Sequence, residues 1–299
     1  MTNAESRGGN KLCIEPIENI GVQERADAFG SGDAKRVYEI QYKDFSIGIN
    51  LGDIAQAPSE AVMCPSTRWI ELGRGAIETR LADEIGVTLF RDYAQDLRKI
   101  AGEVLRAEGD DRLNAASELG KLLNEKGGLR VKASPLQLAF EIASSFEISI
   151  LPGGEEHPTL IYGAAIPIPS GRLSDRGIKL VVLANVTPDT SESERSGIMT
   201  RRNMEDFAFN TCKSAEFVGV HSMTIPSVGV GFATALGYGL SRTDSMNGFF
   251  AGAKRFADVL GKESSLKQID YNIHAAPSLE NAALIANVAS QVGITELFR

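Results

Sequence analysis

Cysteine and histidine are scarce in this chain of 299 residues, which contains three of each. The cysteines, Cys13, Cys64 and Cys212, are far apart in the sequence, and no CxxC pair is present. An odd number of dispersed cysteines does not form a disulfide framework, and structural zinc sites need closely spaced cysteine or histidine ligands. We therefore expect neither a disulfide-stabilised scaffold nor a metal site.

Long hydrophobic runs are also absent. No window reaches the roughly 18 to 20 consecutive apolar residues that span a bilayer, and the amino-terminal residues MTNAESRGGNK lack the apolar core of a signal peptide. We therefore expect a cytoplasmic protein without a membrane partner. Hydrophobic residues make up 43% of the chain and charged residues 23%, which is ordinary for a globular protein and excludes wholesale disorder.

An excess of basic residues is lacking too. The chain has 31 basic and 39 acidic residues, and its net charge of −8 repels polyanions, so we expect no nucleic-acid partner. A small anionic ligand remains compatible with this charge, because backbone N–H groups and helix amino termini bind phosphate locally. Glycine-rich turns are therefore the segments in which to search for a phosphate site.

The common nucleotide-binding and hydrolase motifs are missing. The chain contains no GxxxxGK[ST], GxSxG or HExxH sequence, and the GxG sequences at 73–75 and 229–231 lack the third glycine of GxGxxG. This argues against P-loop and Rossmann proteins. Each GxG sequence nevertheless lies between a predicted strand and a predicted helix, which places both at the carboxyl end of one sheet, where open α/β sheets bind ligands.

Hydrophobic patterns predict an α/β fold. Alternation is typical of half-buried strands, and short continuous apolar runs are typical of buried parallel strands. Such patterns predict strands at residues 36–42, 45–50, 61–65, 146–151, 159–163, 178–186, 217–227 and 268–273, and helices at 195–213, 241–260 and 278–292. Strands that alternate with helices over short connections predict a three-layer α/β/α domain with a mixed sheet.

A helical segment interrupts this pattern. An apolar spacing of four residues begins at Ile77 and continues to Val104, which predicts an amphipathic helix that Gly86 can break. Further helices are predicted at 113–123 and 136–143.

We expect one domain over residues 36–299, with a helical insertion at about 88–145 and a partly disordered amino-terminal extension over residues 1–35. An alternative is an interaction scaffold. In that case the apolar stripe between Ile77 and Val104 would be an interface with another protein, and the glycine loops would form a degenerate pocket.

Five segments, in this order, resemble segments of macro domains, the ADP-ribose-binding modules. The segments are Gly52-Asp53-Ile54, residues 61–67, residues 73–77, residues 162–164 with 173–188, and residues 225–231 with 237–239, the last of which is about three residues longer than in the family. The resemblance implies a macro-like three-layer fold that binds ADP-ribose or a related NAD-derived nucleotide and requires no cofactor. An ADP-ribosylated macromolecule is the alternative partner.

For the adenine, the resemblance implies contacts from the segment after the second predicted strand. Asp53 would accept a hydrogen bond from the adenine amine, and the backbone N–H of Ile54 would donate to the ring. Asp53 has an alternative role as a turn-capping residue, which Gly-Asp sequences favour.

For the diphosphate and the distal ribose, the resemblance implies backbone contacts from the two glycine loops. The residues of the first loop are Gly73, Gly75, Ala76 and Ile77. The residues of the second loop are Gly229, Val230, Gly231 and Phe232. The first loop would place a helix amino terminus near phosphate, and the second would form a nest of N–H groups. A plain helix-entry loop and close packing of a loop on a helix are the alternatives.

Two positions depart from the family pattern. Members that hydrolyse ADP-ribosyl bonds usually carry an asparagine and an aspartate where this chain has Ser66 and Arg74. A serine cannot make the two-ended contact of an amide, and an arginine is no general base at neutral pH. We therefore expect recognition, with Ser66 and Arg74 near the distal ribose. The alternative is an ADP-ribosyl or O-acyl-ADP-ribose hydrolase that uses another carboxylate, such as Glu78, Asp206 or Asp244.

Overall fold

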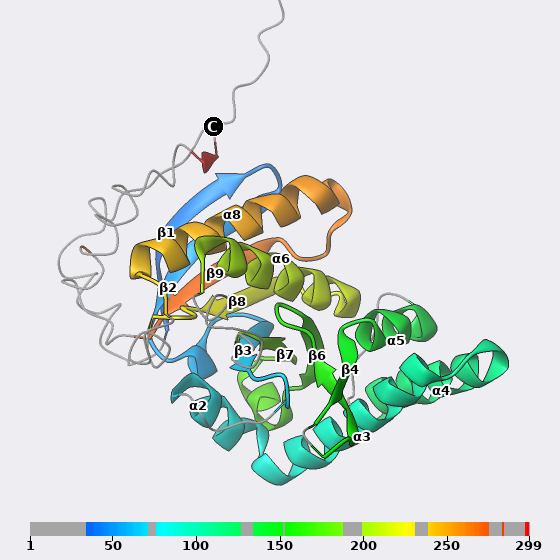
Figure 1. Ribbon diagram of the computed structural model, residues 1–299. Helices are drawn as coiled ribbons and strands as arrows, with labels where there is room; N and C mark the ends of the chain where they lie inside the picture. Colours follow the sequence, from blue (N-terminus) through cyan, green and yellow to red (C-terminus); the bar gives the residue numbers. More distant parts are fainter. Residues whose placement is uncertain are drawn as a thin grey trace, which may run out of the picture.

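The computed structural model describes residues 34–70, 76–126, 134–151, 153–187, 199–230 and 239–274, together with residues 283, 297 and 298 (Figure 1). Residues 1–33 and the predicted helix at 278–292, apart from residue 283, lie outside the described residues.

In this part of the chain, seven strands form one mixed sheet in the order β1-β2-β9-β8-β3-β7-β6. The strands are β1 (Lys35–Tyr42), β2 (Phe45–Leu51), β3 (Ala61–Ser66), β6 (Ala165–Pro169), β7 (Leu180–Asn185), β8 (Ser222–Pro226) and β9 (Gln268–Ile273). The five inner strands run parallel, whereas β1 and β6 pair antiparallel at the two ends of the sheet. The apolar run in β3 is completely buried, as expected of a central parallel strand.

Helices cover both faces of the sheet (Figure 1). On one side, α6 (Arg201–Val218) and α8 (Arg242–Leu260) pack against each other and against the strands. On the other side, α2 (Ala76–Ile85) contacts β3 and the two 3-10 helices η2 (Ile54–Gln56) and η4 (Gly171–Arg176). This arrangement confirms the predicted three-layer α/β fold with a mixed sheet.

Two glycines on α8 allow the close approach of α6. A Cβ atom at Gly248 would lie 2.6 Å from the Cβ of Met204, and one at Gly252 would lie 2.8 Å from the Cβ of Ala208. Side chains at these two positions would push the helices apart. The phenylalanines of α8 then reach the sheet, where Phe256 packs edge-on against Phe45 of β2 at 6.0 Å between ring centroids.

The segment predicted as an insertion forms a helical unit with a small sheet of its own. It contains α3 (Val87–Arg106), α4 (Gly109–Lys121), the π-helical turn η3 (Leu122–Lys126) and α5 (Pro135–Ala143), followed by the hairpin of β4 (Phe146–Ile150) and β5 (Glu156–Leu160). Gly86, with a φ of +97°, separates α2 from α3, as the sequence predicts. The apolar stripe of α3 is buried, since Leu97, Ala101 and Val104 have no exposed surface. The domain boundaries themselves stay predictions.

Several element boundaries differ from the sequence prediction. Strand β6 was not predicted, and the helix expected at 195–213 is α6, which begins at Arg201 and continues to Val218. The strand expected at 217–227 is therefore shorter, because its first two residues end α6 and Gly219 closes the helix with a φ of +78°.

Candidate functional site at the carboxyl edge of the sheet

The five parallel strands end along one side of the sheet, which we call the carboxyl edge. Its strand-terminal residues are Leu51, Ser66, Asn185, Pro226 and Ile273. Backbone hydrogen bonds connect the segments that leave the strands: Gly52 donates to Ile273 at 3.1 Å, and Val186 donates to Ser66 at 3.1 Å. The edge is therefore a continuous row in which all the predicted site segments begin, and it is where ligands bind in open α/β sheets.

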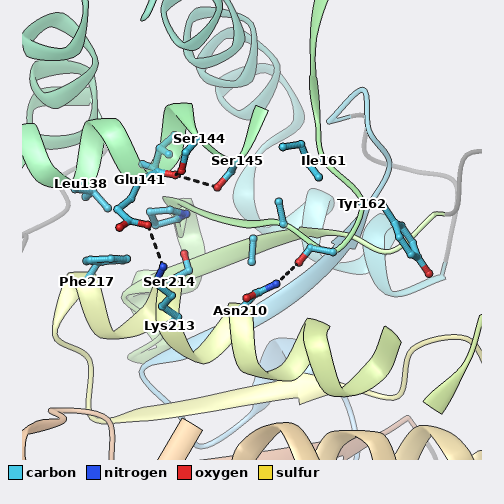
Figure 2. Close-up of a pocket in the computed structure, with 15 residues that line it drawn as sticks. Leu138, Glu141, Ser144, Ser145, Ile161, Tyr162, Asn210, Lys213, Ser214 and Phe217 are labelled. Carbon is cyan, nitrogen blue, oxygen red and sulfur yellow. Dashed lines mark hydrogen bonds and ion pairs between the residues drawn. The ribbon is translucent and has the colours of Figure 1, made fainter. Parts of the chain in front are cut away.

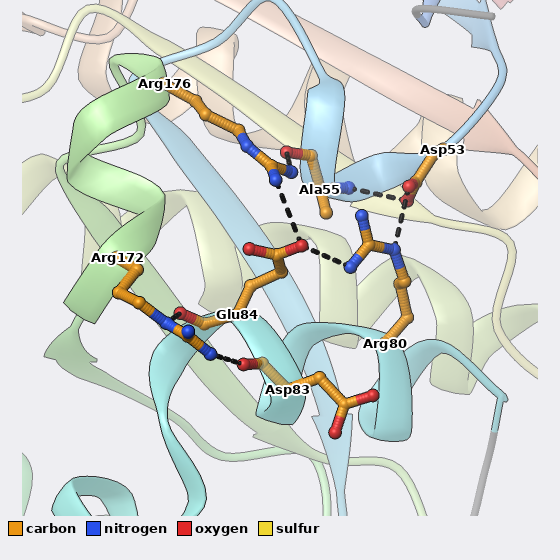
Figure 3. Close-up of polar contacts among 7 residues, drawn as sticks. All are labelled: Asp53, Ala55, Arg80, Asp83, Glu84, Arg172 and Arg176. Carbon is orange, nitrogen blue, oxygen red and sulfur yellow. Dashed lines mark hydrogen bonds and ion pairs between the residues drawn. The ribbon is translucent and has the colours of Figure 1, made fainter.

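Asp53 follows β2 and caps the short helix η2. Its Oδ1 atom accepts a hydrogen bond from the backbone N–H of Ala55 at 3.0 Å, and its Oδ2 atom accepts one from Nε of Arg80 at 2.8 Å (Figure 3). The neighbouring Ile54 side chain is 1% exposed, so it anchors this turn in the core. The capping role that Gly-Asp sequences favour is thus present, and an arginine contact is added to it.

Arg80 belongs to a network that sequence analysis missed. Figure 3 shows its guanidinium group between the carboxylates of Asp53 and Glu84, and Glu84 also accepts a hydrogen bond from Arg176 at 3.0 Å. Arg176 in turn donates to the backbone oxygen of Ala55 at 3.3 Å. The hydrogen bond from Arg80 lowers the pKa of the Glu84 carboxyl below its usual value. The network connects η2, α2 and η4 and fixes the position of Asp53.

Ser66 and Asn185 are neighbours in the register of β3 and β7. Both are nearly completely buried. The Asn185 side chain donates to the backbone oxygen of Leu160 at 2.7 Å and accepts from the backbone N–H of Thr187 at 3.2 Å. An asparagine therefore does lie at the carboxyl edge, on the strand beside Ser66, and its amide joins the core sheet to the end of β5.

The first glycine loop lies mostly outside the described residues, which include neither Gly73, Arg74 nor Gly75. The structure shows that Ala76 begins α2 and that Ile77 is partly buried against the core. The segment that leads into the loop is described as well, and the insertion holds it. Leu160 of β5 donates to Arg68 O at 2.8 Å, and Arg98 of α3 donates to Trp69 O at 3.0 Å.

The second glycine loop is described up to Val230, and Gly231 and Phe232 lie outside the described residues. Gly229 has a φ of +81°, and a Cβ atom there would lie 3.2 Å from Sδ of Met199. Its carbonyl accepts a hydrogen bond from the backbone N–H of Leu240 at 2.8 Å. This bond brings the two ends of the loop together, and Met199 and Leu240 leave little room for a side chain at Gly229.

The carboxylates considered for hydrolysis have structural partners. Asp206 forms an ion pair with Arg255 at 2.8 Å, and Asp244 accepts from Ser241 in the amino-terminal cap of α8. The Glu78 side chain lies outside the described part. Within the described residues, no group of three histidine, cysteine or acidic side chains could hold a metal ion, and no helix is long and apolar enough to cross a membrane.

The fold resembles solved macrodomains. A mutant form of the macrodomain from Oceanobacillus iheyensis aligns with 89% of this chain and 97% of its own, at 11% identity and a TM-score of 0.51. This chain has the macrodomain fold. The ADP complex of the same Oceanobacillus macrodomain aligns with 85% of this chain and 95% of its own, at 11% identity and a TM-score of 0.49. A Trypanosoma brucei macrodomain in complex with ADP-ribose aligns with 82% of this chain and 68% of its own, at 10% identity and a TM-score of 0.46. No protein-family model and no curated protein matches the sequence.

Proposed function

We propose that this protein binds ADP-ribose, or a related NAD-derived nucleotide, at the carboxyl edge of its macrodomain fold. The observation that carries the proposal is the convergence of Asp53, Ser66 and Gly229 at the ends of β2, β3 and β8. These residues are far apart in the sequence, and each belongs to a segment that resembles macro domains. Solved forms of the Oceanobacillus iheyensis macrodomain hold ADP or ADPR, which supports the same ligand class here.

In this proposal Asp53 recognises the adenine. A carboxylate offers about four lone-pair sites, so Asp53 can accept a bond from the adenine amine while it keeps its contacts with Ala55 and Arg80. Because Arg80 holds the carboxylate in place before the ligand arrives, little entropy is lost when the contact forms. Ile54 would add its backbone N–H.

The remaining contacts would come from the two glycine loops. Residues of the first loop, Gly73, Gly75, Ala76 and Ile77, would face phosphate with the amino terminus of α2. Residues of the second loop, Gly229, Val230, Gly231 and Phe232, would enclose the diphosphate. Ser66 and Arg74 would lie near the distal ribose, where Arg74 can contribute a charge-assisted hydrogen bond.

Calorimetric titration with ADP-ribose, followed by analysis of the recovered nucleotide, tests the proposal. We expect micromolar binding and an intact ligand. Hydrolysis of the nucleotide would contradict a pure binding role, and an absence of binding would reject the ligand. The single tryptophan, Trp69, lies four residues before Gly73, so its fluorescence gives a second readout of the same titration.

The substitution Asp53→Ala tests the adenine contact. We expect it to weaken the binding of ADP-ribose and of AMP by about tenfold or more, since a hydrogen bond to a charged group is lost. Binding of ribose 5-phosphate, which has no adenine, should be unchanged in the variant. An equal loss for all three ligands would indicate a damaged fold, and no loss for any would remove the assignment of Asp53. Asp258→Ala, a paired carboxylate on α8, is the matched control.

A further inference from the structure

A pocket of about 230 Å³ lies between helix α5 of the insertion and helix α6 of the core (Figure 2). The loop at residues 161–164 closes one end, where Asn210 of α6 donates to Gly163 O at 2.8 Å. At the other end, Lys213 of α6 forms an ion pair with Glu141 of α5 at 3.0 Å. None of the residues that line this pocket belongs to the proposed ADP-ribose site.

The α6 wall of the pocket presents hydrogen-bond donors on one helical stripe. Asn210, Lys213, Ser214 and Phe217 follow the i, i+3, i+4, i+7 spacing of residues on one face of a helix. Asn210 uses one amide hydrogen for Gly163 and keeps the second, and the Lys213 ammonium keeps two hydrogens beyond its bond to Glu141. Three residues with donors therefore line the same pocket.

The Ser214 hydroxyl makes this wall unusual. Ser214 is only 5% exposed, yet its Oγ atom has no hydrogen-bond partner within the described residues. Figure 2 shows the hydroxyl directed into the pocket. A buried polar group without a partner destabilises a fold, and a bound molecule that accepts its hydrogen bond removes that penalty.

The α5 wall is complementary, because it presents acceptors. The Glu141 carboxylate lies opposite Lys213. The hydroxyls of Ser144 and Ser145, which directly follow α5, donate to the Glu141 backbone oxygen at 2.8 and 3.1 Å, and this leaves their oxygen lone pairs available. Between these polar groups lie the apolar side chains of Leu138 and Ile142. The pocket thus has a positive side, a negative side and an apolar surface.

We propose that this pocket binds a free α-amino acid with an apolar side chain. Lys213, Ser214 and Asn210 would donate hydrogen bonds to the carboxylate, and Glu141 with the hydroxyls of Ser144 and Ser145 would accept hydrogen bonds from the ammonium group. The space, about 230 Å³, suits a ligand well below drug size. The ion pair between Lys213 and Glu141 is exposed and therefore weak in water, so a zwitterion can separate its partners without leaving either charge unpaired.

Calorimetric titration of the full chain with L-leucine and L-phenylalanine tests this site. We expect saturable binding of at least one of them, and no binding of leucinamide or 4-methylpentanoate, which lack the carboxylate and the ammonium group respectively. Equal binding of 4-methylpentanoate would overturn the zwitterion assignment. An absence of binding at millimolar amino acid would overturn the site altogether. Neither result depends on whether ADP-ribose binds.

Two variants locate the binding. Ser214→Ala should weaken leucine binding by about tenfold, and it should leave the melting temperature of the free protein unchanged or higher because it removes an unpaired buried hydroxyl. A purely structural role for Ser214 would lower the melting temperature instead. Lys213→Gln should also weaken binding by at least about tenfold. Lys254→Gln is the matched control, since Lys254 likewise pairs with a carboxylate, Asp258, and lies over an aromatic ring. Unchanged binding in both pocket variants would overturn the assignment.

Discussion

Gly48 of β2 occupies a position where a side chain has no room. The Arg36 side chain of β1 passes over it to reach the Asp270 carboxylate of β9, at 2.8 Å. Asp270 is completely buried, and this burial raises the pKa of its carboxyl even though Arg36 and Gln268 contact it. A buried ion pair of this kind is costly to disturb, because each partner left alone is an uncompensated charge.

We therefore expect Gly48→Ala to destabilise the fold by about 2 to 4 kcal/mol. The new Cβ would lie 2.6 Å from Oδ1 of Asp270 and 2.6 Å from the backbone oxygen of Tyr38, so either the ion pair or the strands must shift. Urea unfolding at pH 7 measures the effect. Gly153→Ala is the control, since a Cβ there meets no atom within 4 Å. Similar losses in both variants would contradict the explanation.

At the scale of single side chains, contacts between neighbours in the sequence could be predicted, whereas contacts between distant residues could not. The capping role of Asp53 could be predicted, because it depends on residues two positions apart. The contact with Arg80 could not, since it requires α2 and η2, 27 positions apart in the sequence, to meet. The i, i+4 spacing of Arg80 and Glu84 was the one local signal of this network. The role of Asn185 was hidden for the same reason, because its side chain bonds to a residue 25 positions away.

At the scale of helices and strands, the elements with a clear hydrophobic pattern were predicted correctly. The strands β1, β2, β3, β7 and β9 follow the alternating or continuous apolar patterns, and the helix predicted at 241–260 is α8, which begins at Arg242 after the capping residue Ser241. Strand β6 was missed because Pro167 and Pro169 are atypical of strands. Strand β6 lies at the end of the sheet. Proline is tolerated there because only one side of the strand pairs with a neighbouring strand.

The insertion forms hydrogen bonds with the segment that follows β3 and leads into the first glycine loop. Arg98 of α3 donates to Trp69 O, and the next residue, Ile70, is a buried β-branched residue with a φ of +55°. Such a backbone conformation is strained and persists only where surrounding contacts hold it. The insertion supplies some of these contacts, which gives it a structural role beside the site.

We expect Arg98→Ala to loosen this segment and to lower the stability by about 1 to 2 kcal/mol, because Trp69 O loses a charge-assisted hydrogen bond. Acrylamide quenching of Trp69, the single tryptophan, should increase. Arg106→Ala is the control on the same helix, since its ion pair with Glu156, at 3.3 Å, joins α3 to β5 without touching Trp69. Equal quenching in both variants would indicate that Arg98 does not hold the segment.

Across the whole molecule, the predicted site residues and the ion pairs of Glu60 and Asp258 lie at opposite edges of the sheet. The predicted site residues follow the carboxyl ends of the parallel strands, whereas Glu60 precedes β3 at the amino ends. Glu60 accepts from the backbone N–H of His221 at 2.8 Å and pairs with Lys179, so it joins the starts of β3, β7 and β8. On the same edge, Asp258 of α8 accepts from Tyr42 OH at 2.7 Å. We expect substitutions at the edge that contains Glu60 and Asp258 to change the stability of the fold without changing the affinity for ADP-ribose.

The contribution of Glu60 to stability can be tested by varying the pH. Burial acts to raise the pKa of the Glu60 carboxyl, but hydrogen bonds from Lys179 and His221 outweigh burial and lower the pKa from 4.5 to about 2. A group whose pKa is lower in the folded state stabilises the fold above its ordinary pKa, and this contribution disappears as the pH falls through the folded value. The stabilisation by Glu60 is therefore complete above about pH 4.5 and is lost toward pH 2.

We expect Glu60→Gln to be about 1 kcal/mol less stable than the unmodified protein at pH 7, the worth of a partly screened charge contact. In urea unfolding measured at a series of pH values, the difference should shrink steadily below pH 4.5 as the carboxyl becomes protonated. The control is Glu155→Gln, whose side chain is 78% exposed beside His157 and should contribute little at any pH. A constant difference down to pH 2 would show that the contact is not electrostatic. A changed affinity for ADP-ribose in Glu60→Gln would show that the two edges are coupled, since Glu60 lies at the opposite ends of the strands from Asp53.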